Sequence, residues 1–305
     1  MEFTFDGRPT QVVGIDENGY GPILGPLVVT AVVLEVDGDP WDRLRLKHLD
    51  TRIRDSKEVF RGSLLTYRTG ESLALSILRE VSDPPRTFSS YLESLTGRPL
   101  TEHFSGCPAL QSLHPDMPLP VWLPADVQPS LWRPVPGIRV LKILQRVIHP
   151  EEFNRRIQAL QSKALLDFLT FLELVKAANP GPPDQDLLCL MGKIGGTTHY
   201  KKWFFMAGLP EVQTLRESRG WSRYRVGRWD LNFLMDADAQ FLPVAMASIL
   251  GKYTRELFML SLSHGLGEGS PMPFASGYRH DSRTSQMIDL LVQHNVPVHC
   301  FLRVK

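Results

Sequence analysis

The chain has 305 residues, with 34 Lys and Arg against 33 Asp and Glu and a net charge of +1. Its composition, 43% hydrophobic and 22% charged without a glycine period, is that of a globular protein and excludes collagen-like, coiled-coil and disordered chains. The balanced charge argues against a general polyanion binder such as a histone-like protein. The cysteines are odd in number and widely spaced (Cys107, Cys189, Cys300), which excludes a disulfide framework and a CxxC zinc site.

Membrane and secretion signals are not visible in the sequence. The longest apolar runs, at residues 26–36 and 164–174, are shorter than the roughly 18 residues of a membrane-spanning helix, and Asp167 interrupts the second run. The first ten residues hold no basic segment followed by an apolar stretch, so we see no signal peptide. We therefore expect a cytoplasmic protein that acts away from membranes.

The first half of the chain alternates predicted strands and helices. Residues 11–16 and 27–36 are apolar and rich in β-branched side chains, and the glycines and prolines between them predict two neighbouring antiparallel strands. The apolar spacing over 60–81 predicts one or two helices, interrupted by Gly70. Many prolines and little periodicity predict an irregular insertion or flap over about 87–137.

The second half continues this alternation. Its predicted elements are a strand over 139–148, a helix beginning at 150, a helix over 162–178, strands over 186–191 and 229–238, and a helix over 243–260. This order predicts an α/β fold with a mixed sheet flanked by helices. We expect a core over residues 1–240, interrupted by the insertion, and a C-terminal helical region over 241–305 that packs on it.

The first candidate for chemistry is the acidic pair Asp16 and Glu17, at the end of a predicted strand. Adjacent side chains of a regular strand face opposite sides, so this pair converges on one site only if the chain turns, and residues 19–22 supply a turn. Two converging carboxylates repel each other unless a cation intervenes, which favours Mg²⁺ or Mn²⁺. The alternative is an ordinary strand end with one solvated acid.

The second candidate is the pair Asp236 and Asp238. Residues two apart on a strand share a face, so both side chains can point into one site. Taken alone, this pair is equally consistent with a solvated strand end. The helix predicted to follow carries small residues between 245 and 251, which allow close approach to a neighbouring element.

Four segments together resemble the ribonuclease HII family. The family's opening pattern G-[IV]-D-E-x-G-R-G-P-x-x-G-P matches residues 14–26, with Tyr20 at the position of the arginine. The D-S-K element appears at 55–57, and the element K-G-D-x…A-A-S-I-[LI]-A-K-x-x-R-D is similar to residues 236–256. The family's late G-Y pair corresponds to residues 277–278, and all four segments occur in the family's order.

This resemblance implies a ribonuclease H-like fold and a site of four carboxylates that binds two divalent metal ions. Asp16, Glu17 and Asp238 fall on three of the four catalytic, metal-binding acids. The tyrosine at 278 falls on the residue that packs against the sugar at the RNA–DNA junction, and the glycine backbone at 19–21 falls on the segment that reads the 2′-hydroxyl. The expected substrate-binding residues are Gly19, Tyr20, Gly21, Lys57, Ser248, Lys252 and Tyr278.

The fourth acid of the family is missing at its expected position. In the family it closes a strand just before a glycine, and the corresponding position here falls on Met191 or Gly192, neither of which binds a metal ion. The neighbouring Lys193 adds a positive charge that disfavours a second cation.

Three explanations are open for the missing acid. Asp236 replaces a residue that is often lysine in the family, so it is a candidate replacement ligand. Asp184 or Asp186 supplies the ligand if the strand register differs. The third explanation is that the site has lost its chemistry.

Tyr20 is the second departure from the family pattern. A planar arginine grips a phosphate through two parallel hydrogen bonds, and tyrosine does not. Tyr20 either stacks on a base or sugar or packs against its own turn. Selectivity for a single ribonucleotide within DNA therefore stays open.

Residues 193–228, the basic tract, hold eight Lys and Arg against two Glu. Aromatic residues are interleaved with them or follow directly, among them Trp203, Trp221, Tyr224 and Trp229. Basic and aromatic side chains together suit neutralisation of a nucleic-acid backbone and base stacking. The alternative is a solvated hairpin whose aromatic residues belong to the core.

These features favour an enzyme: a divergent ribonuclease HII-like endonuclease that hydrolyses the RNA strand of RNA–DNA hybrids or of ribonucleotide-containing DNA with Mg²⁺ or Mn²⁺. We expect it to act as a monomer. The alternative is a catalytically inactive nucleic-acid-binding protein that keeps the fold. A third possibility is a protein whose insertion chiefly binds a protein partner.

Overall fold

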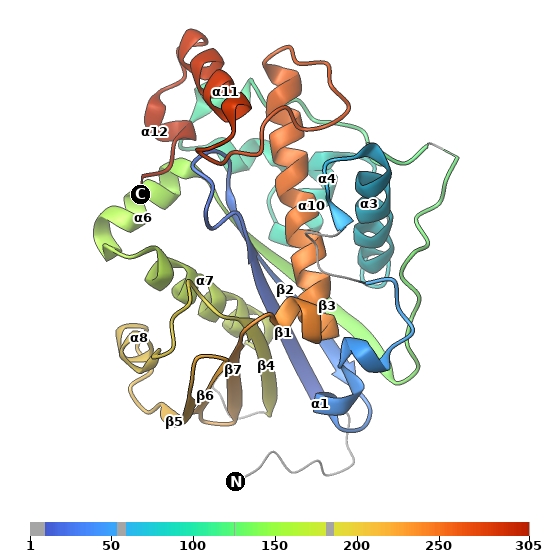
Figure 1. Cartoon of the computed structure of the whole chain (residues 1–305), viewed down its shortest axis with the longest axis vertical. Coiled ribbons are helices and arrows are strands. Elements are labelled where there is room, and N and C mark those ends of the chain that lie inside the picture. The colour runs from blue at the N-terminus through green and yellow to red at the C-terminus, as the bar shows by residue number, and fades with distance from the viewer. Residues whose placement is uncertain (1–9, 54–58, 125, 181–185, 305) are drawn as a thin grey trace.

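The computed structural model describes residues 10–53, 59–124, 126–180 and 186–304 (Figure 1). The D-S-K segment with Lys57, and Asp184, lie outside the described residues. The described strands form one sheet in the order β3-β2-β1-β4-β7-β6-β5, in which β1, β4 and β7 are parallel and the other pairs are antiparallel. Their bounds are β1 (Thr10–Asn18), β2 (Leu27–Val36), β3 (Ile138–Ile148), β4 (Leu187–Gly192), β5 (Gln213–Glu217), β6 (Trp221–Val226) and β7 (Trp229–Leu234).

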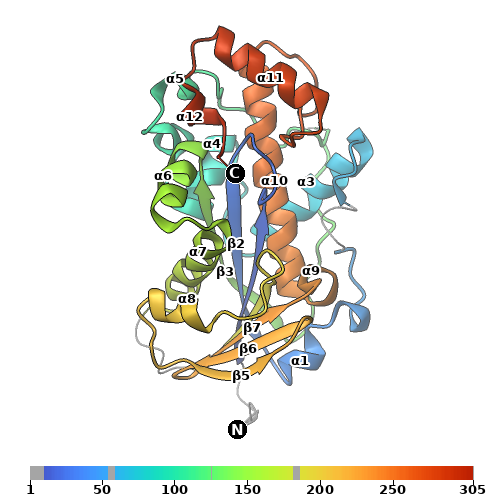
Figure 2. The same ribbon diagram turned by 60° about the vertical axis from the view of Figure 1, so that its left-hand side comes forward.

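Helices cover both faces of this mixed sheet. They are α1 (Pro40–Arg43), α3 (Leu64–Leu78), α4 (Phe88–Thr96), α5 (Pro108–Gln111), α6 (Pro150–Leu160), α7 (Lys163–Ala178), α8 (Lys201–Met206), α9 (Ala237–Gln240), α10 (Leu242–Gly265), α11 (Ser282–Gln293) and α12 (Val298–Phe301), with 3-10 helices at Leu46–His48 and Leu100–Phe104. Figure 2 shows the central strands between α10 on one side and α6 and α7 on the other. The predicted α/β class is therefore confirmed.

Strands β1 and β2 are largely buried because a hydrophobic core lies on each face of the sheet. Alternate residues of β1 belong to different cores: Val12 packs on the α10 side, whereas Val13 and Ile15 pack on the α7 side. The predicted antiparallel pairing is confirmed, with Thr10 opposite Val36 in β2. None of the helices in the described part of the chain has both the length and the hydropathy that crossing a bilayer requires.

Helix α10 approaches the sheet closely because small residues lie at the contact. A Cβ atom added at Gly14 would lie 2.4 Å from the carbonyl carbon of Pro243. One added at Gly251 would lie 2.6 Å from Nδ2 of Asn18, whose amide donates to the Ser248 carbonyl at 3.1 Å. The close approach expected from the small residues at 245–251 is confirmed, and it brings the start of α10 against the end of β1.

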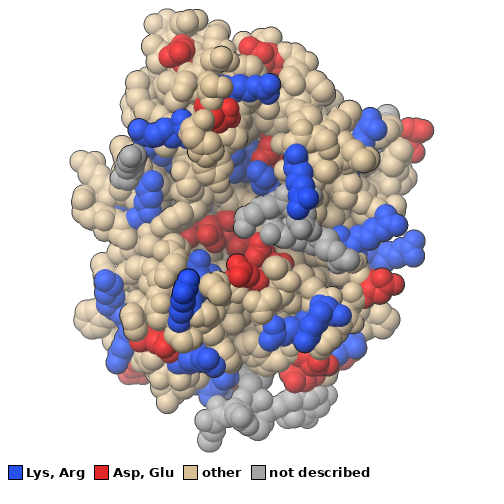
Figure 3. Space-filling view, viewed as in Figure 1, with Lys and Arg blue, Asp and Glu red and all other residues tan. Residues whose placement is uncertain are grey.

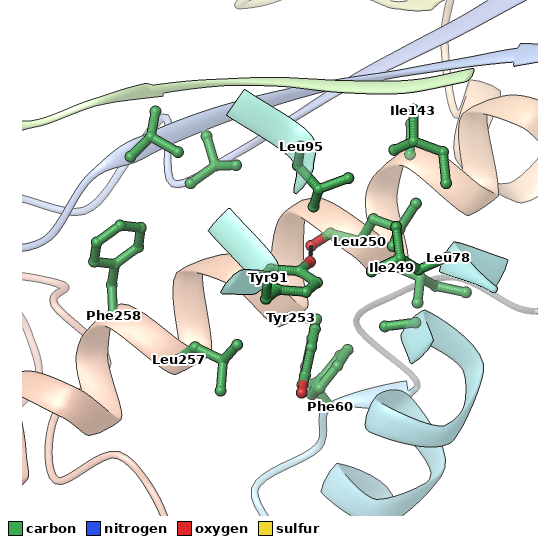
Figure 4. Close-up of a cluster of buried hydrophobic side chains, with 14 of the residues drawn as sticks. Phe60, Leu78, Tyr91, Leu95, Ile143, Ile249, Leu250, Tyr253, Leu257 and Phe258 are labelled. Atoms are coloured by element: carbon green, nitrogen blue, oxygen red, sulfur yellow. Dashed lines mark hydrogen bonds between the residues drawn. The ribbon is translucent and has the colours of Figure 1, made fainter. Parts of the chain in front are cut away.

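Helices α3 and α4 pack beside α10, and α4 also contacts β3 (Figure 4). Tyr91 of α4 shares a hydrogen bond with Thr254 at 2.8 Å, and its ring meets Tyr253 edge-on at 5.3 Å. Phe88 meets Phe258 in the same way at 4.9 Å. These contacts join the segment after residue 87 to α10.

Two predictions about these helices are wrong. Gly70 does not interrupt a helix, because α3 runs through it, and the absent Cβ makes room for the ring of Phe60, whose Cζ lies 2.2 Å from the Cβ position. The start of the 87–137 segment is not irregular, since α4 begins there with a capping box between Thr87 and Ser90. The prolines that suggested irregularity begin only at residue 108, beyond this helix.

Cys107 and Cys300 form a disulfide between the start of α5 and α12. No spacing pattern in the sequence indicated this single bond, because the two residues are 193 positions apart and only the fold brings them together. The expectation that no disulfide framework exists is not changed, since the remaining cysteine, Cys189, is buried in β4 without a disulfide.

Glu71 of α3 fixes the proline-rich segment to the core. Its buried carboxylate accepts backbone hydrogen bonds from Val121, Trp122 and Leu123 at 2.6–2.7 Å and a hydroxyl bond from Tyr253 at 2.9 Å. One side chain thus satisfies three backbone groups that no strand partner reaches.

We expect Glu71→Ala to lower the free energy of unfolding by about 3 kcal/mol or more, because it leaves these donors without an acceptor in the core. Denaturant unfolding monitored by circular dichroism measures the change. Glu93→Ala, at an exposed position of α4, is the control and should change stability by less than about 0.5 kcal/mol. Equal losses in the two variants would contradict this role for Glu71.

Three histidines, the buried His114 and the half-buried His103 and His149, lie around Phe104 and Phe258. The Phe104 ring lies 4.4 Å from the ring of His114 and 4.7 Å from that of His149. Burial lowers the pKa of His114 to about 3 and, with help from a nearby arginine, the pKa of His103 to about 4. Burial also lowers the pKa of His149. The folded chain therefore keeps these rings neutral where the unfolded chain protonates them.

Stability should consequently fall on acidification below about pH 6.5, the pKa of an unfolded histidine. Each histidine that stays neutral in the fold contributes a loss of about 2 kcal/mol between pH 7 and pH 5. His114→Gln should remove about that amount from the pH dependence, whereas the exposed His264→Gln should not. Thermal unfolding from pH 7 to pH 5 tests this, and an unchanged slope for His114→Gln would be inconsistent with the assignment.

Candidate active site

A cavity of about 540 Å³ lies where β1 and β4 end, between the loop after β1 and the start of α10. It contains the four acids singled out in the sequence, Asp16, Glu17, Asp236 and Asp238. The expected substrate residues that the structure describes also line it: Gly19, Tyr20, Gly21, Ser248, Lys252 and Tyr278. Figure 3 shows acidic side chains gathered near the centre of one face, with lysines and arginines around them.

Asp16 and Glu17 converge without the predicted turn between them. Both belong to β1, which continues to Asn18, so the turn at 19–22 comes too late to bring them together. Both carboxylates lie beside the glycine that ends β4: a Cβ atom at Gly192 would lie 3.1 Å from Oδ1 of Asp16 and 3.5 Å from Oε2 of Glu17. The two acids therefore meet at the end of β4.

The strand register shows which residue occupies the position beside Asp16. Ile15 pairs with Met191 across the parallel β1–β4 ladder, and Met191 is fully buried in the core on the α7 side. Gly192 is therefore the residue next to Asp16. Asp186 lies at the opposite end of β4 and pairs with Arg228, so it does not replace the missing acid.

Asp236 and Asp238 do not belong to a strand, and the prediction of a strand to residue 238 is wrong. Strand β7 ends at Leu234, and Asp236 has left-handed backbone angles (φ 51°, ψ 39°) immediately before α9. Aspartate adopts this conformation more readily than most residues, which ends the strand here. Asp238 lies in the first turn of α9, and both side chains reach the cavity from this turn.

A further carboxylate, missed in the sequence interpretation, lies beside this group. Asp167 projects from α7 and is fully buried. Burial, the charge of Asp167 and then that of Asp16 raise the pKa of Glu17 well above its ordinary value. Burial and Asp16 raise the pKa of Asp167 in the same way. The sequence signal was an acid that interrupts the apolar run 164–174, which also holds Glu173 near its end.

The residues expected to bind substrate line the cavity from the loop after β1, from α10 and from the segment around Tyr278. The Cβ position of Gly21 lies 3.2 Å from Cε1 of Tyr278, whose side chain is 43% exposed and so accessible to a ligand. Gly19 has a positive φ of 87°, which an ordinary side chain would strain. On α10, Lys252 forms an ion pair with Glu256 at 2.5 Å.

Tyr20 packs inward. A Cβ atom at Gly195 would lie 2.9 Å from the Tyr20 hydroxyl oxygen, so the ring tip lies against the loop after β4. Burial, together with the charges of Asp167 and Glu17, raises the pKa of Tyr20. Tyr20 thus packs against the loop after β4, and not against its own turn as the second of the two roles proposed.

Lys193 lines the cavity, but its ammonium group is held by other partners. It donates to the carbonyls of Thr197 at 3.1 Å and Ser218 at 2.8 Å, and to the Ser222 hydroxyl at 3.2 Å. These bonds direct its charge to the loop after β4 and to the β5–β6 hairpin.

The basic tract divides into an internal part and an exposed part. Arg223 and Arg225 pair with the buried Asp230, and the aromatic residues Trp203, Tyr224 and Trp229 belong to the core, as the hairpin alternative predicts. Trp221 is partly buried, with the guanidinium of Arg216 4.7 Å from its ring centroid. Arg228 is exposed and pairs with Asp186. The other exposed cations are Lys201, Lys202, Arg216 and Arg219, and Arg219 also lines the cavity.

The donor set suits a hard divalent cation. Asp16, Glu17 and Asp238 offer carboxylate oxygens, which Mg²⁺ and Mn²⁺ prefer. Asp167 adds two buried oxygens that have no hydrogen-bond partner. A positive ion among these groups would reduce both their mutual repulsion and the cost of their burial.

Comparison with known proteins agrees with this arrangement. Residues 213–303 match the family model for Ribonuclease HII, which includes Asp238 and Tyr278 but not Asp16. A curated Ribonuclease HII from Latilactobacillus sakei subsp. sakei (strain 23K) is 31% identical over 96 residues, which are 31% of this chain and 34% of that protein. The alignment thus spans about a third of the length of the curated relative.

Among solved structures, a chain of the PCNA:RNase HII complex from Archaeoglobus fulgidus superposes with a TM-score of 0.51 at 17% identity, covering 97% of this chain and 94% of that one. The ribonuclease H2 from Pyrococcus horikoshii OT3 superposes with a TM-score of 0.44 at 17% identity, covering 96% and 92%. At such identities the first of these likenesses shows the fold. The chain therefore has a ribonuclease H-like fold, and its resemblance to the ribonuclease HII family is confirmed.

Proposed function

We propose that this chain is a metal-dependent endonuclease that hydrolyses the RNA strand of RNA–DNA hybrids or of ribonucleotide-containing DNA. One observation carries the proposal: Asp238, which is far from Asp16 and Glu17 in the sequence, lines one cavity with them and with the substrate residues expected from the family. The matched family model and the ribonuclease H-like fold support it.

In this proposal the carboxylates of Asp16, Glu17 and Asp238 hold Mg²⁺ or Mn²⁺. Such ions supply an activated water and stabilise the leaving oxygen of a phosphodiester. The chain's own contribution is positioning: Tyr278 and the backbone at 19–21 bind the sugar, while Ser248 and Lys252 line the cavity from α10. The 2′-hydroxyl is the group that distinguishes RNA from DNA there.

Exposed cations of the basic tract, Lys201, Lys202, Arg216 and Arg219, extend the binding surface away from the carboxylates. Lysine and arginine side chains neutralise nucleic-acid phosphates, and this term depends on salt. The small net charge of the whole chain is compatible with this role, because the tract carries +6 and the remainder of the sequence is acidic. We propose that the tract contacts the duplex beside the cavity.

Gly192 favours the second candidate, an inactive nucleic-acid-binding protein, because it leaves the family's fourth carboxylate position empty. The third possibility, a partner-binding insertion, receives less support. Trp122 and Trp132, the large aromatic residues of that segment, are buried with exposed fractions of 3% and 5% and offer no aromatic surface to a partner.

A cleavage assay tests the proposal. An RNA–DNA hybrid, and separately a DNA duplex with one ribonucleotide, are incubated with the protein in Mg²⁺ and in Mn²⁺. We expect cleavage of at least one substrate, and a loss of about 1,000-fold or more in Asp16→Asn because a metal-binding carboxylate is removed. Asp186→Asn makes the same chemical change at the other end of β4 and should retain activity.

Binding of either substrate without cleavage under both metals would favour the inactive protein. Cleavage that persists in Asp16→Asn would show that the reaction takes place elsewhere. If neither substrate binds, both nucleic-acid functions are wrong.

A further inference from the structure

Asp167 differs from the other buried carboxylates of the described residues. Glu71 accepts three backbone bonds and one from Tyr253, Asp230 pairs with two arginines, and Glu256 pairs with Lys252. Asp167 is 0% exposed, and neither of its carboxylate oxygens has a hydrogen-bond partner. Since an unpaired buried carboxylate costs several kcal/mol, such a group calls for a partner that the side chains around it do not supply.

Asp167 approaches the site from the face of the sheet that α7 covers. Helix α7 packs on the same face of β1 as Ile15, and Glu17 is the next residue of β1 on that face. The start of α7 reaches the loop after β4, where the Cβ atom of Ala164 lies 3.7 Å from the Cβ position of Gly195. Asp167, one turn further along α7, therefore faces the ends of β1 and β4.

Asp167 does not itself line the cavity, but its charge acts on residues that do. Its charge raises the pKa of Glu17, and the charge of Asp16 in turn raises the pKa of Asp167. It also raises the pKa of the Tyr20 and Tyr200 hydroxyl groups. The Tyr200 hydroxyl accepts the backbone hydrogen bond of Ile194 at 3.2 Å, in the loop that follows Gly192. Asp167 thus belongs to the same electrostatic group as the two acids of β1.

The cations that line the cavity do not compensate this charge through the bonds they make. Lys193 is bound to carbonyl and hydroxyl groups, Lys252 is paired with Glu256, and Arg255 donates to the carbonyls of Leu24 and Ser276. The remaining cation, Arg219, is exposed, whereas Asp167 is fully buried. A divalent cation already expected at Asp16 and Glu17 would supply the positive charge that these side chains do not.

We propose that Asp167 supplies the fourth carboxylate of the metal site, from the helix beneath the sheet, in place of the strand-end acid that is absent at Gly192. The inference rests on the proposed function, because it needs a divalent cation at Asp16 and Glu17. It assigns the fourth ligand to a different element of the fold from the one that carries it in the family pattern. Asp236, at the exposed rim of the cavity, is then not required for metal binding.

Mn²⁺ binding, measured from the free Mn²⁺ signal in electron paramagnetic resonance, tests this assignment without relying on activity. We expect Asp167→Asn to weaken Mn²⁺ affinity at least tenfold, and Asp16→Asn to weaken it as much or more. Asp236→Asn should leave the affinity within about twofold. The matched control is Glu173→Gln, because Glu173 lies on the same helix but pairs with Arg146 and Arg156 at its solvent side.

Thermal unfolding separates a metal ligand from a structural residue. Without metal, with EDTA present, Asp167→Asn should unfold at the same temperature as the wild type or higher, because an uncompensated buried charge is removed. With Mn²⁺ added, the stabilisation seen in the wild type should be smaller in Asp167→Asn. A residue with only a structural role would instead lower the unfolding temperature in EDTA.

A second test moves the carboxylate from position 167 to position 192. Gly192→Asp restores a carboxylate at the family's position, where the Cβ atom points toward Asp16 and Glu17. We expect the double variant Asp167→Asn with Gly192→Asp to recover Mn²⁺ affinity to within about threefold of the wild type.

The outcomes distinguish this inference from the proposed function. If the wild type binds Mn²⁺, Asp16→Asn loses it and Asp167→Asn retains it, the inference is overturned while the proposed function stands. Weakening by Asp236→Asn but not by Asp167→Asn assigns the ligand to Asp236 and also overturns it. If the wild type binds no Mn²⁺, the metal-dependent function and the inference are both wrong.

Discussion

The repulsion among carboxylates at the ends of β1 and β4 is the constraint on which the rest of the site depends. Asp16 and Glu17 face opposite sides of β1, yet their carboxylates meet at the glycine that ends β4. Asp238 approaches from α9 and Asp167 from α7. Charges of one sign held together at low solvent exposure oppose folding, so the remainder of the protein must hold this group in place until a cation compensates it.

The scaffold does so through close packing on both faces of the sheet. Helix α10 lies against β1 because Gly14 and Gly251 lack side chains, and this contact fixes the end of β1 beside the start of α10. On the other face α7 packs on β1 through a separate core. Helices α3 and α4 stiffen α10, and Glu71 secures the proline-rich segment to these helices. The contacts that stabilise the fold thus lie away from the acidic site, as expected where a functional group of like charges lowers stability.

Periodicity and turn residues were sufficient to predict the main strands and helices, because burial imposes those patterns along the chain. They were insufficient where a single residue, or a contact between residues distant in sequence, determines the local structure. Gly70 lies inside a helix, where the ring of Phe60 occupies the space that a side chain would take. Asp236 has a left-handed backbone just after β7 ends at Leu234, so the strand does not continue to residue 238. The acids at 16, 17 and 238 were found through motifs. Asp167 was not, because its proximity to Glu17 exists only in three dimensions.

The central claim is that these carboxylates together form a divalent metal site. Anomalous diffraction from crystals soaked in Mn²⁺ tests it most directly, because it locates the ion independently of any activity. The account predicts an anomalous peak within coordination distance of Asp16 and of Asp167, at the end of β1 beside Gly192. A peak bound by Asp16 and Asp236 alone would contradict the role of Asp167, and no peak in the cavity would contradict the metal site itself.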